Sequence, residues 1–255
     1  MSQYKISGGV MEGLGKKGIL TPDKYGYYRV LAGGLDTYST SGAFYSSKGT
    51  LQFFDETSSF MRRIKKDCVY AENGHPKPLP GMTKVDYINR LLDIREDRVC
   101  GHISNLIIDP LFGQNNPDQV NREMIGLFID VKPDGELGYV LQDAIDNPKQ
   151  NLAFSKRTLT NDQVGSNRQL TKYIHTAITF DKVNEGGIVA ADRRNAIGLE
   201  NHEELVDTDL LKEILSDNIQ HLGLEDSTKK FYEEVMEAVS KTDVKRRKNS
   251  KIFKW

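Results

Sequence analysis

Three polar residues, far apart in the chain, have the side-chain types that nucleophilic catalysis requires. They are His75, Ser155 and Asp181, separated by 80 and 26 positions. A serine hydroxyl is a poor nucleophile near neutral pH, so it needs a base such as histidine to take its proton, and a carboxylate can orient that base. Serine and aspartate are common, and most such pairs are surface residues. Whether these three residues could form a catalytic site therefore depends on the structural elements that carry them.

The segment 151–183 is predicted to form a strand, a loop and a second strand. Its first part is a short apolar run that stops at Ser155, which places this serine at the end of the first strand. The polar residues 160–169 contain a glycine and predict the loop. Residues 173–183 are rich in β-branched and aromatic side chains, so the second strand carries Asp181 in its apolar end.

His75 belongs to the sequence ENGHPKPLP at residues 72–80, which has three prolines in five positions. Prolines at this density exclude a helix and a central strand. The histidine is therefore predicted on a rigid loop that directly follows a strand-like segment. A fixed position suits a general base, although a histidine taken alone is more often a structural residue.

The other segments mix helices with short strands. Residues 83–94 have apolar positions at helical spacing after Thr83, a suitable N-cap, and predict an amphipathic helix. Residues 97–108, with a possible break at Gly101, and residues 124–131 predict strands. Because no βαβ pattern repeats, the sequence predicts an α+β fold. Further expectations are an exposed loop at 38–49, a helix or strand start within 51–72, a turn-rich loop at 109–122 and a short helix or strand at 139–146.

The composition is typical of a globular protein with a polar, solvent-exposed surface. The chain has 255 residues, 38% hydrophobic and 28% charged, and a formal net charge of −1, which argues against polyanion binding by the folded body. No apolar run approaches the roughly 18 residues that a membrane span needs, and the N-terminus lacks the pattern of a signal peptide. Cys68 and Cys100 lack zinc-ligand spacing and predict reduced thiols, although a cysteine nucleophile stays an alternative.

The last part of the chain changes character. Residues 203–222 and 227–239 both have helical periodicity. Residues 241–255 form a basic tail with seven Lys or Arg against one Asp, a net charge of +6, and include Phe253 and Trp255. Two interpretations of this tail are equally good: a solvated end, or a segment that docks on nucleic acid or a partner.

The three polar residues lie in sequence motifs that resemble a known family. GHPKPLPGMTKVDYINRLLDI surrounds His75, AFSKRTLT surrounds Ser155, and HTAITFDKVNEGG surrounds Asp181. In this order they resemble the tailed-bacteriophage prohead proteases, particularly those of large myophages, which are distant relatives of herpesvirus assemblin. The resemblance covers roughly residues 65–195. The chain departs from the family at 185–187, where Glu-Gly-Gly replaces the usual Pro-Gly, and in an apparent insertion around 109–122.

The resemblance implies a serine endopeptidase that needs no cofactor or metal. Ser155 would be the nucleophile, His75 the base and Asp181 the residue that orients His75. His175 is a rival for the third role, because assemblins use a second histidine there. Six strand residues separate it from Asp181 by roughly 20 Å, so only one of them can reach His75. Arg193 and Arg194 resemble the basic pair that helps to form the assemblin oxyanion site, although surface salt bridges explain them equally well.

The resemblance also implies a biological setting. The expected fold is a small, mostly antiparallel β-barrel flanked by helices, as in assemblin, with a protease domain at 1–198 and a helical, basic C-terminal region at 199–255. Expected substrates are scaffold or core proteins and the major capsid protein, inside the prohead in the host cytoplasm, with self-association left open. Family members often cut after Glu and cut themselves, which makes three sites candidates for autocleavage: Glu200, Glu225 and Glu237.

Two other functions stay open. One is an inactive capsid or scaffold component that keeps the family fold, which loss of activity in Ser155→Ala would exclude. The other is nucleic-acid binding through the basic tail, which predicts steeply salt-dependent binding that is lost when residues 241–255 are deleted.

Overall fold

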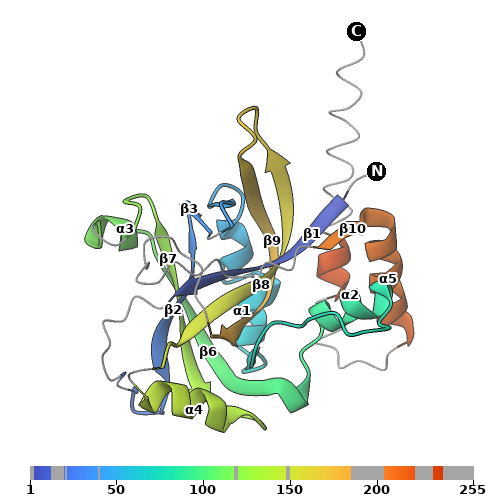
Figure 1. Ribbon diagram of the computed structural model, residues 1–255. Helices are drawn as coiled ribbons and strands as arrows, with labels where there is room; N and C mark the ends of the chain where they lie inside the picture. Colours follow the sequence, from blue (N-terminus) through green and yellow to red (C-terminus); the bar gives the residue numbers. More distant parts are fainter. Residues whose placement is uncertain are drawn as a thin grey trace.

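The computed structural model describes residues 3–12, 20, 22–39, 41–117, 120–147, 150–184, 204–221 and 232–237 (Figure 1). Its elements, in chain order, are β1 Gln3–Glu12, β2 Tyr28–Leu35, β3 Thr37–Tyr38, β4 Phe44–Ser46, η1 Leu51–Phe54, α1 Ser59–Ile64, β5 Tyr70–Glu72, α2 Lys84–Leu92, η2 Glu96–Arg98, β6 Val99–Asp109, α3 Phe112–Asn115, β7 Ile125–Pro133, α4 Gly138–Asp146, β8 Ala153–Val164, β9 Leu170–Val183, β10 Glu204–Asp207 and α5 Thr208–His221.

The strands form two sheets. The larger has the order β10-β1-β8-β9-β4-β3 and the smaller the order β2-β7-β6-β5. All strand pairs are antiparallel except β4 with β9, and the sheets curl around a shared core (Figure 1). Helices α1 and α4 contact β6 of the smaller sheet. This architecture confirms the predicted α+β class. Among the described residues, no helix is long and apolar enough to cross a membrane.

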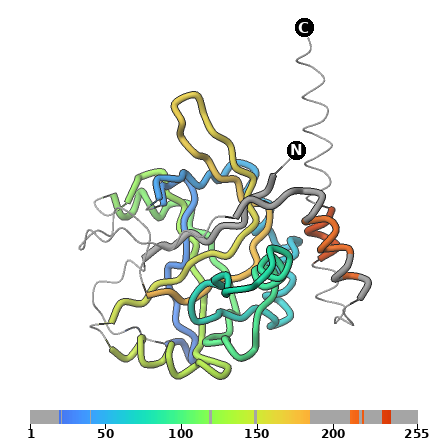
Figure 2. The backbone as a smooth tube through the Cα atoms, turned by 45° about the vertical axis from the view of Figure 1, so that its right-hand side comes forward, coloured from blue at the N-terminus to red at the C-terminus, as the bar shows by residue number. Residues whose placement is uncertain are grey.

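The hairpin of β8 and β9 is longer than the sequence predicts. Pairing continues as far as Val164 with Leu170, so the turn between the strands covers only residues 165–169. The prediction of a loop from residue 160 was therefore wrong, as was the placement of Ser155 at the end of a strand, because it lies near the beginning of β8. Backbone pairing does not require apolar side chains, and the polar end of the hairpin extends beyond the body into solvent (Figure 2).

The main core lies between the two sheets. Its fully buried side chains come from both sheets and from α1, and include Phe60, Ile103, Leu127, Phe154 and Phe180. Tyr45 also belongs to this core and is 2% exposed, so residues 38–49 are only partly the exposed loop that their composition predicts. The β4 strand within that segment pairs with β9, which turns Tyr45 inward.

Strand β6 runs without a break through Gly101. A Cβ at this glycine would lie 2.9 Å from Leu141 of α4 and 3.0 Å from Val131 of β7. Glycine therefore permits the close packing of α4 on the sheet, and the possible break predicted there is absent from the described strand.

A second apolar cluster joins α2 to the C-terminal region. Thr83 caps α2 in a capping box with Asp86, as its sequence predicts. The buried face of α2 packs against α5 and the helical residues 232–237 (Figure 1). The buried members of this cluster are Tyr87, Ile88, Leu91, Leu92, Leu159, Ile178, Leu211, Ile214, Leu215, Tyr232 and Val235.

The helix predicted over 203–222 begins only at Thr208, because residues 204–207 form β10 and pair with β1. Within the segment 227–239, residues 232–237 are helical, and its expected N-cap, Ser227, lies outside the described residues. The basic tail, with Phe253 and Trp255, also lies outside them.

Candidate active site

Strand pairing places Ser155 beside Asp181. The two residues are directly opposite each other in the β8–β9 ladder. Side chains of opposite residues in an antiparallel pair project from the same face of the sheet, where they are neighbours. Both side chains are fully buried, at 0% exposure. A separation of 26 positions in the sequence thus becomes direct adjacency.

The proline-rich loop after β5 brings His75 to the same face. At its start, the Gly74 N–H donates to the carbonyl of Lys182, the residue after Asp181, at 2.7 Å. Gly74 has a φ of +84°, which glycine adopts without strain. On the other side of His75, the Tyr87 hydroxyl donates to the Pro76 carbonyl at 3.3 Å. The loop is therefore held from both β9 and α2, as its composition predicts for a rigid segment.

The three side chains form a continuous hydrogen-bonded chain. His75 Nε2 lies 2.5 Å from Ser155 Oγ, and His75 Nδ1 lies 2.8 Å from Asp181 Oδ2. A carboxylate can only accept a hydrogen bond, so Nδ1–H donates to it. When the ring is neutral, Nε2 then presents its lone pair to the serine hydroxyl. With 11% exposure, the His75 side chain keeps a narrow opening to solvent. This geometry can draw a proton from Ser155.

Asp181 is held as an anion by donors on both of its oxygens. Oδ1 accepts from Arg157 Nη2 at 2.7 Å and from the Glu72 N–H at 3.3 Å, while Oδ2 accepts from Arg157 Nε at 2.9 Å in addition to His75. Burial alone would raise the pKa of Asp181, but the charge of Arg157 and the hydrogen bond from His75 outweigh it and lower the pKa to about 2. Asp181 is ionised at neutral pH.

A buried charge network extends behind Asp181. Arg157 Nη2 lies 3.2 Å from Glu72 Oε2, and Arg157 Nη1 donates to the Asp93 carbonyl at 2.8 Å. Glu72 also pairs with Arg90 of α2 and accepts from the Arg95 N–H at 2.7 Å. The sequence motifs did not predict this network. The signal that could have found its first member is strand alternation, which puts Arg157 on the face of Ser155 two residues earlier.

The remaining predicted residues lie elsewhere. The ring of His175, the rival for the third position, packs against Phe53 with centroids 5.4 Å apart. Glu237 is exposed at the end of the helical residues 232–237. The other tentative residues lie outside the described part of the chain: Arg193, Arg194, Glu200 and Glu225.

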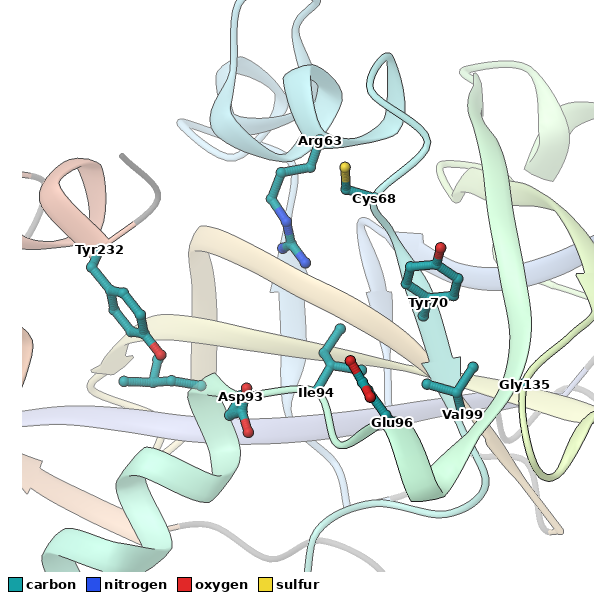
Figure 3. Close-up of a pocket in the computed structure, with 10 residues that line it drawn as sticks. Arg63, Cys68, Tyr70, Asp93, Ile94, Glu96, Val99, Gly135 and Tyr232 are labelled. Carbon is teal, nitrogen blue, oxygen red and sulfur yellow. The ribbon is translucent and has the colours of Figure 1, made fainter. Parts of the chain in front are cut away.

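A cavity of about 410 Å³ lies behind the network, between α1, the end of α2 and the C-terminal region (Figure 3). The guanidinium of Arg63 points into it, with Tyr232 and Asp93 on the opposite wall. Its lining includes neither His75 nor Ser155 nor Asp181. Asp93, which lines the cavity, also belongs to the network, because its carbonyl accepts from Arg157.

Comparisons with known proteins establish the family of this chain. The model of the peptidase S80 family matches residues 6–248. This chain belongs to the peptidase S80 family. The capsid maturation protease of Pseudomonas phage phiKZ is 33% identical over 207 residues, which are 80% of this chain and 74% of the relative. The structure of the capsid assembly protease of bacteriophage T4 superimposes with a TM-score of 0.42 and 10% identity, covering 71% of this chain and 97% of that one.

Membership of the S80 family makes this chain a protease and confirms its resemblance to phage prohead proteases. The family match covers the body together with α5 and the helical residues 232–237. The part of this chain that matches the family therefore includes the C-terminal region as well as the strands that carry Ser155 and Asp181.

Proposed function

We propose that this S80 peptidase is a serine endopeptidase in which Ser155, His75 and Asp181 form the catalytic triad. The observation that carries the proposal is the hydrogen-bonded chain from Ser155 Oγ through both nitrogens of His75 to Asp181. The proposed order has chemical support, since a histidine in the middle can both accept from a hydroxyl and donate to a carboxylate.

In the proposed mechanism, Ser155 Oγ attacks the scissile carbonyl carbon while its proton passes to His75 Nε2. The tetrahedral intermediate then breaks its C–N bond, and the amine leaves with the proton from His75, which gives an acyl-serine. Water, which gives a proton to His75, then attacks the ester carbonyl. The bond to Ser155 Oγ breaks, the new carboxyl end leaves, and His75 returns the proton to Ser155. Asp181 stays ionised and keeps Nδ1–H of His75 in place. Arg193 or Arg194 would help to stabilise the oxyanion, a role that rests on the family resemblance alone.

The proposed substrates are the scaffold or core proteins and the major capsid protein of a phage prohead, cut inside the prohead during maturation in the host. The relative from phage phiKZ, named as a capsid maturation protease, supports this setting. We further propose cleavage after Glu, an assemblin-like barrel, and autocleavage at Glu200, Glu225 or Glu237. Glu237 belongs to the helical residues 232–237, so a cut there would require local unwinding.

Intact mass over time tests the proposal, with wild-type protein beside Ser155→Ala and Asp181→Ala. The expected result is a wild-type product that ends at Glu, the absence of this product in Ser155→Ala, and a strongly slowed reaction in Asp181→Ala. A wild-type chain that stays whole and cleaves no Glu-containing scaffold peptide would favour an inactive structural protein. If Asp181→Ala cut at a near-normal rate, Asp181 would not be the third member of the triad.

A further inference from the structure

The guanidinium of Arg157 contacts both oxygens of Asp181 and also the Glu72 carboxylate. We propose that Arg157 is a positioning residue, which fixes the Asp181 carboxylate in the orientation that His75 uses, and that Glu72 holds Arg157 in place. This inference rests on the proposed serine peptidase function.

The hydrogen-bond geometry constrains the carboxylate strongly. A carboxylate on a free side chain can rotate about its Cβ–Cγ bond, so one bond to His75 would leave its plane undefined. Arg157 adds two roughly parallel bonds, from Nε to Oδ2 at 2.9 Å and from Nη2 to Oδ1 at 2.7 Å. This fork-to-carboxylate pairing fixes the plane of the acceptor as well as its position. Oδ2 then has its remaining acceptor direction available for His75 Nδ1.

The charges show that orientation is the main contribution of the pair. Arg157 and the partly buried Arg90 balance the buried Asp181 and Glu72, so these four groups together have no net charge. When His75 becomes protonated during catalysis, it faces a carboxylate whose charge Arg157 already compensates. Asp181 therefore acts on His75 chiefly by holding the ring and its tautomer, and this action depends on a rigid carboxylate.

Arg90 provides a matched control for a merely structural role. Like Arg157, it binds Glu72 and donates to the main-chain carbonyl of Asp93, in its case at 3.2 Å. Its described contacts, unlike those of Arg157, do not include Asp181. The Lys substitution at either position keeps the positive charge and removes the planar fork. A role in stability predicts similar effects of the two substitutions, whereas a positioning role predicts an effect on reactivity only at Arg157.

The test is the rate at which a fluorophosphonate probe modifies Ser155 in the full chain, followed by intact mass and peptide mapping. This readout needs no knowledge of the natural substrate. We expect Arg157→Lys to lower the maximal inactivation rate on the order of 100-fold, with little change in the half-saturating probe concentration. Arg90→Lys is expected to stay within about threefold of wild type in both parameters. Urea unfolding of each variant shows that the proteins compared are folded.

Equal maximal rates for Arg157→Lys, Arg90→Lys and wild type would overturn the positioning role while leaving the proposed function intact. Absence of labelling in folded wild-type protein would overturn the proposed function and, with it, this inference. If Arg157→Lys does not fold, Glu72→Gln takes its place, because it keeps the side-chain shape and weakens the support of Arg157. We expect this variant to react roughly tenfold more slowly, and an unchanged rate would contradict the inference.

Discussion

Two neighbouring buried cations, on opposite faces of β8, have pKa values that are shifted in opposite directions. On one face, Arg157 lies between Asp181 and Glu72, and although burial alone would lower its pKa, these carboxylates raise it. On the other face, the Lys156 ammonium donates to the Gly34 carbonyl at 2.8 Å and lies 3.7 Å from the ring centre of Tyr45. Burial, with a smaller effect from Lys172, lowers the pKa of Lys156 to about 7.

This difference separates function from stability within one strand. The face of Ser155 compensates its buried charges with bidentate pairs, and rigid geometry is the result. On the face of Lys156, desolvation disfavours the charged form of the amine, which costs stability at neutral pH without contributing a contact to the proposed triad. Substitutions on the first face should therefore change activity, and those on the second should change the pH dependence of unfolding.

The largest expected effect is that of Ser155→Ala, on the first face. Loss of the nucleophile should lower peptide hydrolysis on the order of a million-fold, and His75→Ala should do the same. Because the two residues act as one unit, the double variant should be no slower than either single one. Progress curves with a peptide that the wild type cleaves provide the measurement. A double variant much slower than both single variants would break the proposed coupling.

Asp181→Asn is expected to lower the maximal rate by about 10⁴-fold, since an amide can stabilise the wrong tautomer of His75. This variant also tests the charge balance through stability. The pKa of Asp181 is about 2 in the folded protein and 3.8 as its usual value, so its ionised form stabilises the fold above pH 3.8 and this contribution is lost as pH falls toward 2.

Urea unfolding at pH 3 to 6 measures that contribution as the difference between wild type and Asp181→Asn. The difference in the free energy of unfolding should shrink as pH falls. A difference that stays constant over this range would show that Asp181 does not carry a compensated charge.

Lys156→Met tests the opposite face. In wild type, Lys156 titrates at about 7 when folded and at its usual value of 10.5 when unfolded. The unfolded chain therefore binds more protons between these values, and stability rises with pH there by up to about 1.4 kcal/mol per pH unit. The Met variant should lose this rise between pH 7 and 9, be more stable than wild type at pH 7, and keep activity within a few-fold. If wild type and Lys156→Met showed the same change in the free energy of unfolding between pH 7 and 9, Lys156 would not have the lowered pKa on which this prediction depends.

The smallest expected effect lies outside both faces, at the cap of α2. Thr83→Ala removes the side-chain acceptor for the Asp86 N–H and should cost about 1 kcal/mol of stability. Activity at 25 °C should change little, because the His75 loop is also held by β9. Thr83→Ser keeps the cap and serves as the control in the same thermal unfolding experiment. An Ala variant that unfolds at the same temperature as the Ser variant would show that the Thr83 cap does not stabilise the fold.

Local chemistry made part of the site predictable. The prolines around His75 define a rigid loop, and the residue types around Ser155 and Asp181 define strands. The register that sets Ser155 opposite Asp181 could not be predicted, because polar residues at 160–164 look like a loop although they are paired in the hairpin.

The buried network was also beyond sequence reasoning. Arg157 and Glu72 have the side chains of surface residues, and their burial depends on contacts between segments far apart in the chain. Arg157 reaches the end of α2, 64 positions away, and the Glu72 N–H reaches Asp181 across 109 positions. Similarly, β10 was predicted as helix because its partner strand lies at the other end of the sequence.

The most direct test of Ser155 as the nucleophile is to trap the acyl-enzyme. Wild-type protein would be mixed with an activated ester of a peptide that ends in Glu, quenched in acid within its first turnovers and digested for peptide mapping. We expect an acyl group on the peptide that contains Ser155, and no adduct in Ser155→Ala. An acyl group on Cys68 or Cys100, or steady hydrolysis that is unchanged in Ser155→Ala, would contradict this expectation.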